Sequence, residues 1–272
     1  MLFRSQKVDG GSWTTLQQVE YTFYTGNETY GGSLGDLMTA EVKDGDGVTQ
    51  TTTYYLYNKT GNFGHGLKYE FSPASYERLV AALGTELSSL TDTQVAPYAD
   101  KAFAYDDQRR VVSETVQGAG ASGENGGLAT FNYAYTNSAN EEGYNSWAVK
   151  SEEMLPDGSK NIVYTNVYGQ VLLKVFTDIE SEQSWISYYR YNDSGRLVLE
   201  ASPSAVIGYD DSYSDLLHDD EGDYEYLNND SGLLTVYDYY TSTTATESTA
   251  GGVAGYQQSV AVQQGELCRT KF

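Results

Sequence analysis

The sequence predicts an all-β protein, an antiparallel β-hairpin repeat sheet forming a spiral or shell segment, with one short inserted helix near residues 75–90. Of 272 residues, 26 are Tyr, which suits the half-buried surfaces of strands. Aromatic residues recur two positions apart, directly ahead of turn sequences. The aromatic content of 14% also argues against disorder, since disordered chains are poor in aromatic residues.

The hairpin sequence is clearest in residues 187–203. Tyr189 and Tyr191 are two apart, so on a strand their rings share one face. Asn192 can bond the backbone two residues on, and Gly195 accepts a positive φ at no steric cost. A second apolar segment follows, which predicts two strands joined by a tight turn.

Four other segments repeat this pattern in full or in part. The residues in the repeated slots are Tyr55, Tyr57, Asn58 and Gly61; Phe103, Tyr105, Asp106 and Arg110; Asn166 and Gly169; Tyr189, Tyr191, Asn192, Gly195 and Arg196; and Tyr226, Asn229 and Gly232. Arg109 stands where Gly is expected, and a left-handed conformation there would cost about 1 kcal/mol. We therefore expect a turn of different shape at Arg109.

The rest of the sequence predicts two further hairpins, one helix and a division of the chain into three regions. Further hairpins are expected around residues 44–47 and 156–158, which carry Asp-Gly turn sequences. Helical spacing of apolar residues at 75–90, after Pro73, predicts an amphipathic helix within an insertion at 73–92. The predicted regions are 1–50, an incomplete N-terminal hairpin region; 51–240, the repeat region; and 241–272, a Thr/Gly-rich segment leading into a continuation. The stretch at 241–252 is either a Thr-rich strand with a turn or a linker.

The repeated units resemble the tyrosine-aspartate (YD) repeats of the rearrangement-hotspot (Rhs) family, most closely in YRYNDSGRLVLE. This resemblance covers roughly residues 50–240 and implies a β-sheet spiral whose hairpins wind into a shell. Members of the Rhs family include polymorphic toxins, the cocoon subunits of insecticidal toxin complexes, and adhesion proteins. The Asp-Pro-x-Gly motif of the self-cleaving core is missing, so that active site is not carried over. The resemblance therefore extends to the repeat wall alone.

Composition restricts the partners. A formal charge of −22 would repel nucleic acid and anionic membranes. No apolar run is long enough to insert in a membrane. Cys268, His65 and His218 offer no zinc-site spacing. We expect an extracellular or cell-surface protein. The first residues lack a signal peptide and both ends are abrupt, which suggests a fragment.

Three motifs could carry chemistry. The acidic stretch at 210–225 contains weak calcium candidates, although a solvated acidic loop is the simpler interpretation; the candidates are Asp210, Asp211, Asp219, Asp220 and Asp223. Residues 118–123 match a dinucleotide-binding pattern, but no helix is expected after them, so a surface loop is expected. Ser33 lies in a Gly-x-Ser-x-Gly pattern, again without the helix of a nucleophile elbow.

The sequence thus favours a structural wall that scaffolds or encapsulates other regions, and not an enzyme. Its partners would be neighbouring repeats of the same polypeptide and an encapsulated effector, and no cofactor is expected apart from the weak calcium candidates. The alternative is an extracellular carbohydrate-binding or adhesion module, because exposed Tyr rings can stack on sugars.

Overall fold

The computed structural model describes residues 2–7, 11, 13–59, 61, 63–117, 128–220 and 223–266. It is nearly all β, with antiparallel strands paired in sequence order in an open sheet, so the predicted all-β antiparallel fold with a short helix is confirmed. The chain divides into two compact units, Met1–Asn132 and Tyr133–Phe272.

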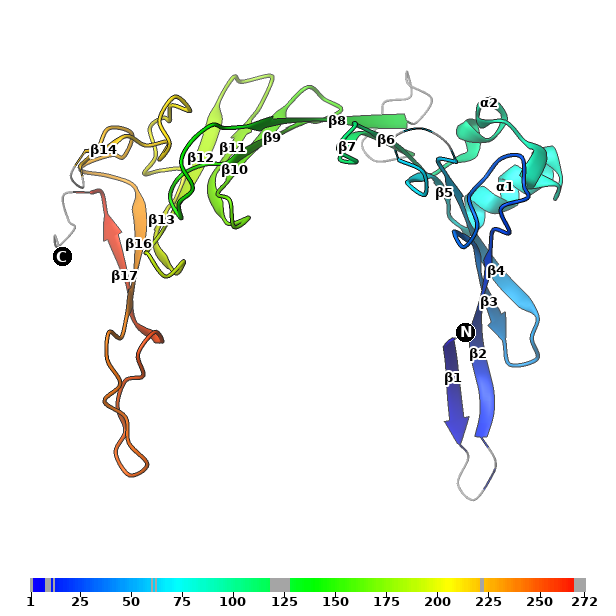
Figure 1. The fold of residues 1–272 in the computed structure, drawn as a ribbon, viewed down its shortest axis with the longest axis horizontal. Helices are drawn as coiled ribbons and strands as arrows, with labels where there is room; N and C mark the ends of the chain where they lie inside the picture. Colours follow the sequence, from blue (N-terminus) through cyan, green and yellow to red (C-terminus); the bar gives the residue numbers. More distant parts are fainter. Residues whose placement is uncertain are drawn as a thin grey trace. The chain divides into compact units, whose positions relative to one another are not determined.

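The first unit is a meander of hairpins with a helical insertion. Its strands are β1 (Leu2–Lys7), β2 (Trp13–Phe23), β3 (Leu37–Asp44), β4 (Thr49–Tyr57), β5 (Leu67–Phe71), β6 (Lys101–Tyr105), β7 (Val111–Gln117) and β8 (Leu128–Asn137), the last of which contains the boundary between the units. The helical elements between β5 and β6 are α1 (Pro73–Leu83), η1 (Leu87–Ser89), α2 (Asp92–Val95) and η2 (Ala96–Tyr98). The helices lie together beside β4 and β5 (Figure 1).

The helix is shorter than the sequence predicted. It begins at Pro73, as expected, but ends at Leu83, because Gly84 takes a φ of 82° and donates its N–H to the Val80 carbonyl. The second half of the predicted helix is instead a 3₁₀ turn that still buries Leu87. The apolar spacing therefore predicted the buried face correctly and the helix end wrongly.

The core of the first unit lies between the helices and the sheet. On β4 the side chains alternate, so that Tyr54 and Leu56 are buried. They form one apolar cluster with Phe71 of β5 and Leu79 of α1, both fully buried. Full burial of one such side chain contributes about 1.5–3 kcal/mol. The insertion therefore covers one face of the hairpins.

The second unit continues the meander and has a different cover. Its further strands are β9 (Val149–Met154), β10 (Lys160–Thr165), β11 (Val171–Thr177), β12 (Ser184–Tyr191), β13 (Leu197–Ala201), β16 (Leu233–Tyr239) and β17 (Gln257–Gln264), with a separate two-stranded ribbon of β14 (Asp219–Asp220) and β15 (Asp223–Tyr224). β16 pairs with β13 on one side and with β17 on the other. The stretch 241–252, predicted to be either a Thr-rich strand with a turn or a linker, contains no strand. It is a long connection inside the β16–β17 hairpin, in which Thr244 and Ala245 donate their N–H groups to Gly252.

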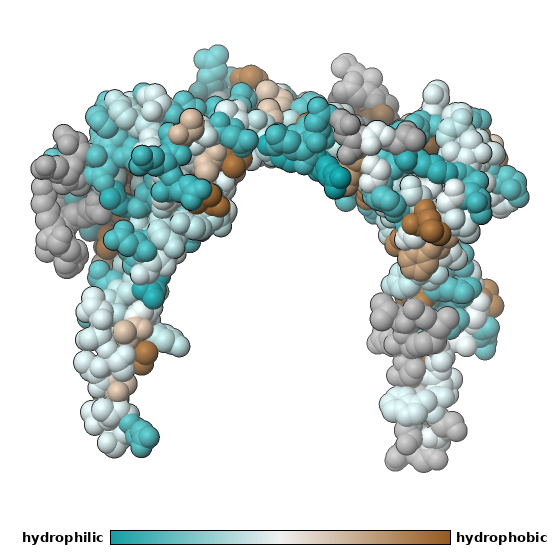
Figure 2. All heavy atoms as spheres, viewed as in Figure 1, coloured by the Kyte–Doolittle hydropathy of each residue, from teal (hydrophilic) through white to brown (hydrophobic). Residues whose placement is uncertain are grey.

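The cover of the second unit is the segment between β13 and β16. Leu216 and Leu217 are fully shielded from solvent and join the cluster of Tyr188 on β12 and Leu199 on β13. The acidic stretch is therefore not a wholly solvated loop, because its apolar residues close the sheet face. Elsewhere the visible surface is largely hydrophilic with scattered apolar spots (Figure 2).

Candidate functional site

Five hairpin turns share one hydrogen-bond geometry, and the turn at Asn192 illustrates it. Asn192 N–H donates to the Arg196 carbonyl (2.9 Å), and Gly195 N–H donates to the Asn192 carbonyl (2.8 Å). Gly195 has a φ of 71°, and the strand register shifts beside the turn. This is a three-residue hairpin loop closed by a left-handed residue and a bulge. The five turns begin at Asp44, Asp106, Leu155, Asn166 and Asn192.

The repeated Asn or Asp stabilises the turn through its side chain. Asn192 Oδ1 accepts the N–H groups of Ser194 and Arg196, each at 3.0 Å. Asn166 accepts two N–H groups in the same way, and Gly169 closes that turn with a φ of 77°. The sequence prediction of side-chain-capped turns is confirmed at these positions.

The prediction of a different turn shape at Arg109 was wrong. Arg109 adopts a φ of 67° and donates its N–H to the Asp106 carbonyl (3.0 Å), as Gly195 does in its own turn. Asp106 also forms a salt bridge with Arg110 (2.7 Å). Acceptance of the Arg110 N–H and contact with its guanidinium lower the pKa of Asp106. These hydrogen bonds and the salt bridge hold Arg109 in the left-handed region.

The first repeat departs from the predicted geometry. Asn58 N–H donates to the Gly66 carbonyl (2.8 Å), and His65 N–H donates to the Asn58 carbonyl (2.9 Å). His65, with a φ of 72°, therefore takes the position predicted for Gly61. Gly61 also has a positive φ. It lies in the loop between Asn58 and Gly66, which is four residues longer than the loop between Asn192 and Arg196.

The fifth repeat is not a hairpin. Gly232 has a φ of 87°, but β16 after it pairs with β13 and β17 and not with the segment that contains Tyr226. Asn228 caps this bend by accepting N–H groups from Asp230 and Ser231, whereas the predicted residue Asn229 is exposed. The predicted hairpin at Tyr226, Asn229 and Gly232 was therefore wrong.

In two of the repeats the second aromatic residue donates its hydroxyl to the backbone of a neighbouring strand, and Tyr239, which is not one of the predicted repeat residues, does the same. The bonds are Tyr105 Oη to the Leu67 carbonyl (2.7 Å), Tyr191 Oη to the Val171 carbonyl (2.9 Å) and Tyr239 Oη to the Leu197 carbonyl (2.8 Å). Each acceptor is the first residue of the strand that follows the preceding turn. Burial raises the pKa of Tyr105 and Tyr191. Each bond fastens one hairpin to the hairpin before it.

The first aromatic slot is half-buried on the strand. Tyr189 lies near the Lys174 ammonium (5.7 Å to the ring centroid), and its pKa is raised by burial and by Glu200. Phe103 is half-buried on β6, opposite Glu114. In the first repeat, Tyr55 accepts the Tyr24 hydroxyl at its carbonyl (2.8 Å), while the Tyr57 ring meets the Tyr24 ring edge-on (6.4 Å).

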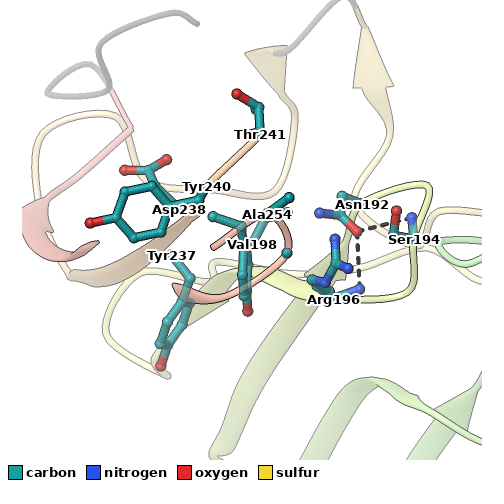
Figure 3. Close-up of a pocket in the computed structure, with 11 residues that line it drawn as sticks. Asn192, Ser194, Arg196, Val198, Tyr237, Asp238, Tyr240, Thr241 and Ala254 are labelled. Carbon is teal, nitrogen blue, oxygen red and sulfur yellow. Dashed lines mark hydrogen bonds between the residues drawn. The ribbon is translucent and has the colours of Figure 1, made fainter. Parts of the chain in front are cut away.

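An open hollow of about 510 Å³ in the second unit is the best candidate binding site (Figure 3). It lies between the β12–β13 turn, the end of β16 and the β16–β17 connection. Its lining residues are Asn192, Ser194, Arg196, Val198, Tyr237, Asp238, Tyr239, Tyr240, Thr241, Ala254 and Gly255. Two of the predicted repeat residues, Asn192 and Arg196, are therefore joined by tyrosines that the repeat pattern did not identify. The close spacing of Tyr237, Tyr239 and Tyr240 was the available signal.

The side chains of the hollow are held in place individually. Tyr237 Oη donates to Glu200 Oε2 (3.1 Å), and burial together with this contact raises the pKa of Tyr237. Ser259 Oγ donates to Asp238 Oδ2 (2.8 Å). The Arg196 guanidinium lies 5.7 Å from the centroid of the Tyr239 ring. The result is a hollow that presents aromatic, amide, hydroxyl and charged groups.

Most of the calcium candidates have protein partners of their own. Asp219 pairs with the Arg190 guanidinium (2.5 Å), while Asp211 accepts the Tyr164 hydroxyl (2.9 Å) and lies near Lys150 (3.3 Å). Asp210 accepts the Ser212 N–H, which lowers the pKa of Asp210. Asp220 and Asp223 lie on the β14–β15 ribbon. Within the described part of the chain, no three His, Cys, Asp or Glu side chains converge on a possible metal position.

The structure brings His65 to the Ser33 loop, which the sequence did not predict. His65 Nδ1 lies 2.8 Å from Asp36 Oδ1, and Asp36 Oδ2 accepts the Ser33 backbone N–H (2.8 Å). The loop continues into strand β3, as expected, and not into a helix. These contacts tie the β2–β3 loop to the β4–β5 loop.

The expected surface loop at 118–123 and residue Cys268 lie outside the described residues. In the described ranges no helix has the length and apolarity that a membrane span requires. The sequence matches no protein-family model and no curated protein.

Proposed function

We propose that this chain is a structural wall segment of a large secreted or cell-surface protein of the Rhs/YD-repeat type. The wall would scaffold or encapsulate other regions of its polypeptide. The proposal assigns the chain no catalytic role.

The observation that supports this proposal most is the hydrogen bond from one hairpin back to the preceding one. Tyr191 uses its hydroxyl on the Val171 carbonyl, so the residue that defines the repeat also fastens the hairpins together. A repeat array gains stability in this way, from contacts between neighbouring units. Such a residue serves the sheet itself, as a wall requires.

Protease digestion of the full-length natural protein tests the wall function. Regions outside residues 1–272 should resist a protease when they are expressed with the wall, and should be cut when they are expressed alone. Equal cleavage rates with and without the wall would contradict encapsulation.

A second candidate function is carbohydrate recognition, which the hollow in Figure 3 favours. Sugars present an apolar ring face and many hydroxyls, and the hollow combines Tyr240 with Asn192 and Asp238. Binding on a glycan array that is lost in Tyr240→Ala and retained in Tyr168→Ala would support it. Tyr168 is a suitable control because it is exposed on another turn.

A further inference from the structure

Arg110 and Arg196 occupy the same position in two equivalent turns but differ in their ion pairs. In the turn at Asp106, the side-chain carboxylate caps the backbone and also binds Arg110 four residues on (Nε to Oδ2, 2.8 Å). The turn at Asn192 has the same backbone geometry and an arginine at the same position, Arg196. Asn192 supplies the capping oxygen but no carboxylate. Arg196 therefore lacks the internal ion pair that Arg110 has.

The Arg196 guanidinium is nevertheless held in place. The Tyr239 ring is near it, and the Gly255 backbone approaches so closely that an added Cβ would lie 2.5 Å from an Arg196 Nη atom. Within the described residues, no carboxylate lies within ion-pairing distance of Arg196. A half-buried cation with no anion in a protein of net charge −22 is unusual, because acidic side chains are abundant. Its fork of N–H donors matches a carboxylate, and holding it in place lowers the entropy lost on binding.

We propose that the hollow binds the carboxylate of an acidic sugar, with Arg196 as the anion-binding group. This inference rests on the second candidate function, carbohydrate recognition, and names its ligand class. Arg196 takes the carboxylate, while Asp238 accepts sugar hydroxyls and repels the acid group, so the two charges fix the orientation of the ring. The phenol ring of Tyr240 offers an apolar surface for the sugar face.

The net charge of the protein does not oppose this contact. Repulsion between separated surface charges is screened over about 8 Å at physiological ionic strength. A direct ion pair in a half-buried hollow is screened less. The binding therefore depends on Arg196 and not on the overall charge.

Titration of the 272-residue chain, followed by NMR at the Arg196 side chain, tests the proposal. The ligands are methyl β-D-glucuronide, its neutral counterpart methyl β-D-glucoside, and acetate as a carboxylate without a sugar. We expect the glucuronide to bind at least about tenfold more tightly than either of the others, as a charged hydrogen-bonded pair implies. Equal affinity for glucuronide and glucoside would overturn the inference and leave carbohydrate recognition standing.

Substitution at Asn192 gives the sharpest control. Asn192→Asp should recreate the internal ion pair of the Asp106 turn, satisfy Arg196 and weaken glucuronide binding about tenfold or more. Arg196→Gln should have the same effect. Val167→Asp adds a carboxylate to an exposed residue of another turn, outside the hollow, and should bind as the parent does. Unchanged binding in Asn192→Asp would overturn the proposal, as would no binding of any of the three ligands to the parent chain. The wall function would be unaffected.

Discussion

Tyr191 donates its hydroxyl to the Val171 carbonyl across the sheet at 2.9 Å. The donor ends one hairpin strand and the acceptor begins the strand after the preceding turn. The repeated tyrosine therefore contributes to the sheet through its hydroxyl as well as through its ring. Tyr105 makes the corresponding bond in its own repeat, and Tyr239, which is not one of the predicted repeat residues, makes a similar one.

Tyr191→Phe should lower the free energy of unfolding by about 1 kcal/mol, because it leaves a part-buried carbonyl without its donor. Urea denaturation followed by the circular dichroism of the sheet measures this loss. Tyr189→Phe is the matched control, since its ring is similarly half-buried on the same strand. Equal losses in the two variants would show that the Tyr191 hydroxyl contributes nothing specific.

Arg109→Gly should stabilise the protein by about 0.5–1 kcal/mol, because Arg109 holds a φ of 67° that costs a side chain energy. The gain is limited by loss of the Arg109 contact with the Phe63 ring (5.6 Å). Gly169→Ala is the opposite change, at a φ of 77° with open space around an added Cβ, and should destabilise by about 1 kcal/mol. Thermal denaturation compares them; a less stable Arg109→Gly would contradict the strain argument.

The Asp106 turn should weaken in acid. The folded-state pKa of Asp106 is lowered, chiefly by the Arg110 N–H, so its carboxylate favours the folded state above the unfolded pKa of about 4. This contribution is lost as the pH falls through the lower folded-state pKa. Asp106→Asn, which keeps the capping oxygen, should therefore flatten the dependence of unfolding free energy on pH below about 4. An unchanged acid profile in the variant would exclude this role.

The β17 strand should promote self-association. Its sequence, QQSVAVQQ, carries no charge, and Val260 and Val262 are exposed at 47% and 64%. Within the described residues, β17 pairs only with β16, so one backbone edge is available to another strand. Val262→Lys should reduce the associated fraction in sedimentation velocity, whereas Val48→Lys, at another exposed apolar residue, should not. A monodisperse parent protein would remove the basis for this prediction.

The sequence predicted what depends on local chemistry. The turn at Asn192 was predictable because its cap and its left-handed glycine lie within five residues. The hairpin order follows from the same local turns. At Arg109 the sequence predicted a different turn shape, but the turn keeps the common hydrogen bonds with Arg109 in the left-handed region.

Features that depend on distant partners were not predictable. His65, which takes the position predicted for Gly61, contacts Asp36, 29 residues away in the sequence. Leu216 and Leu217 cover a sheet face that is built by other strands. Their burial therefore could not be predicted from their sequence neighbours alone. The hollow likewise requires Arg196 and Tyr239, which come together only when β13 pairs with β16.

Hydrogen exchange of the native protein tests the hairpin sheet most directly. The Asn192 amide, bonded to the Arg196 carbonyl, should exchange slowly, and the amide of Asp193 at the exposed turn should exchange quickly. The same contrast should occur between Asn166, bonded to the Gln170 carbonyl, and the exposed Val167. Exchange of Asn192 and of the adjoining strands at unprotected rates would show that these hairpins do not form, and would contradict the account.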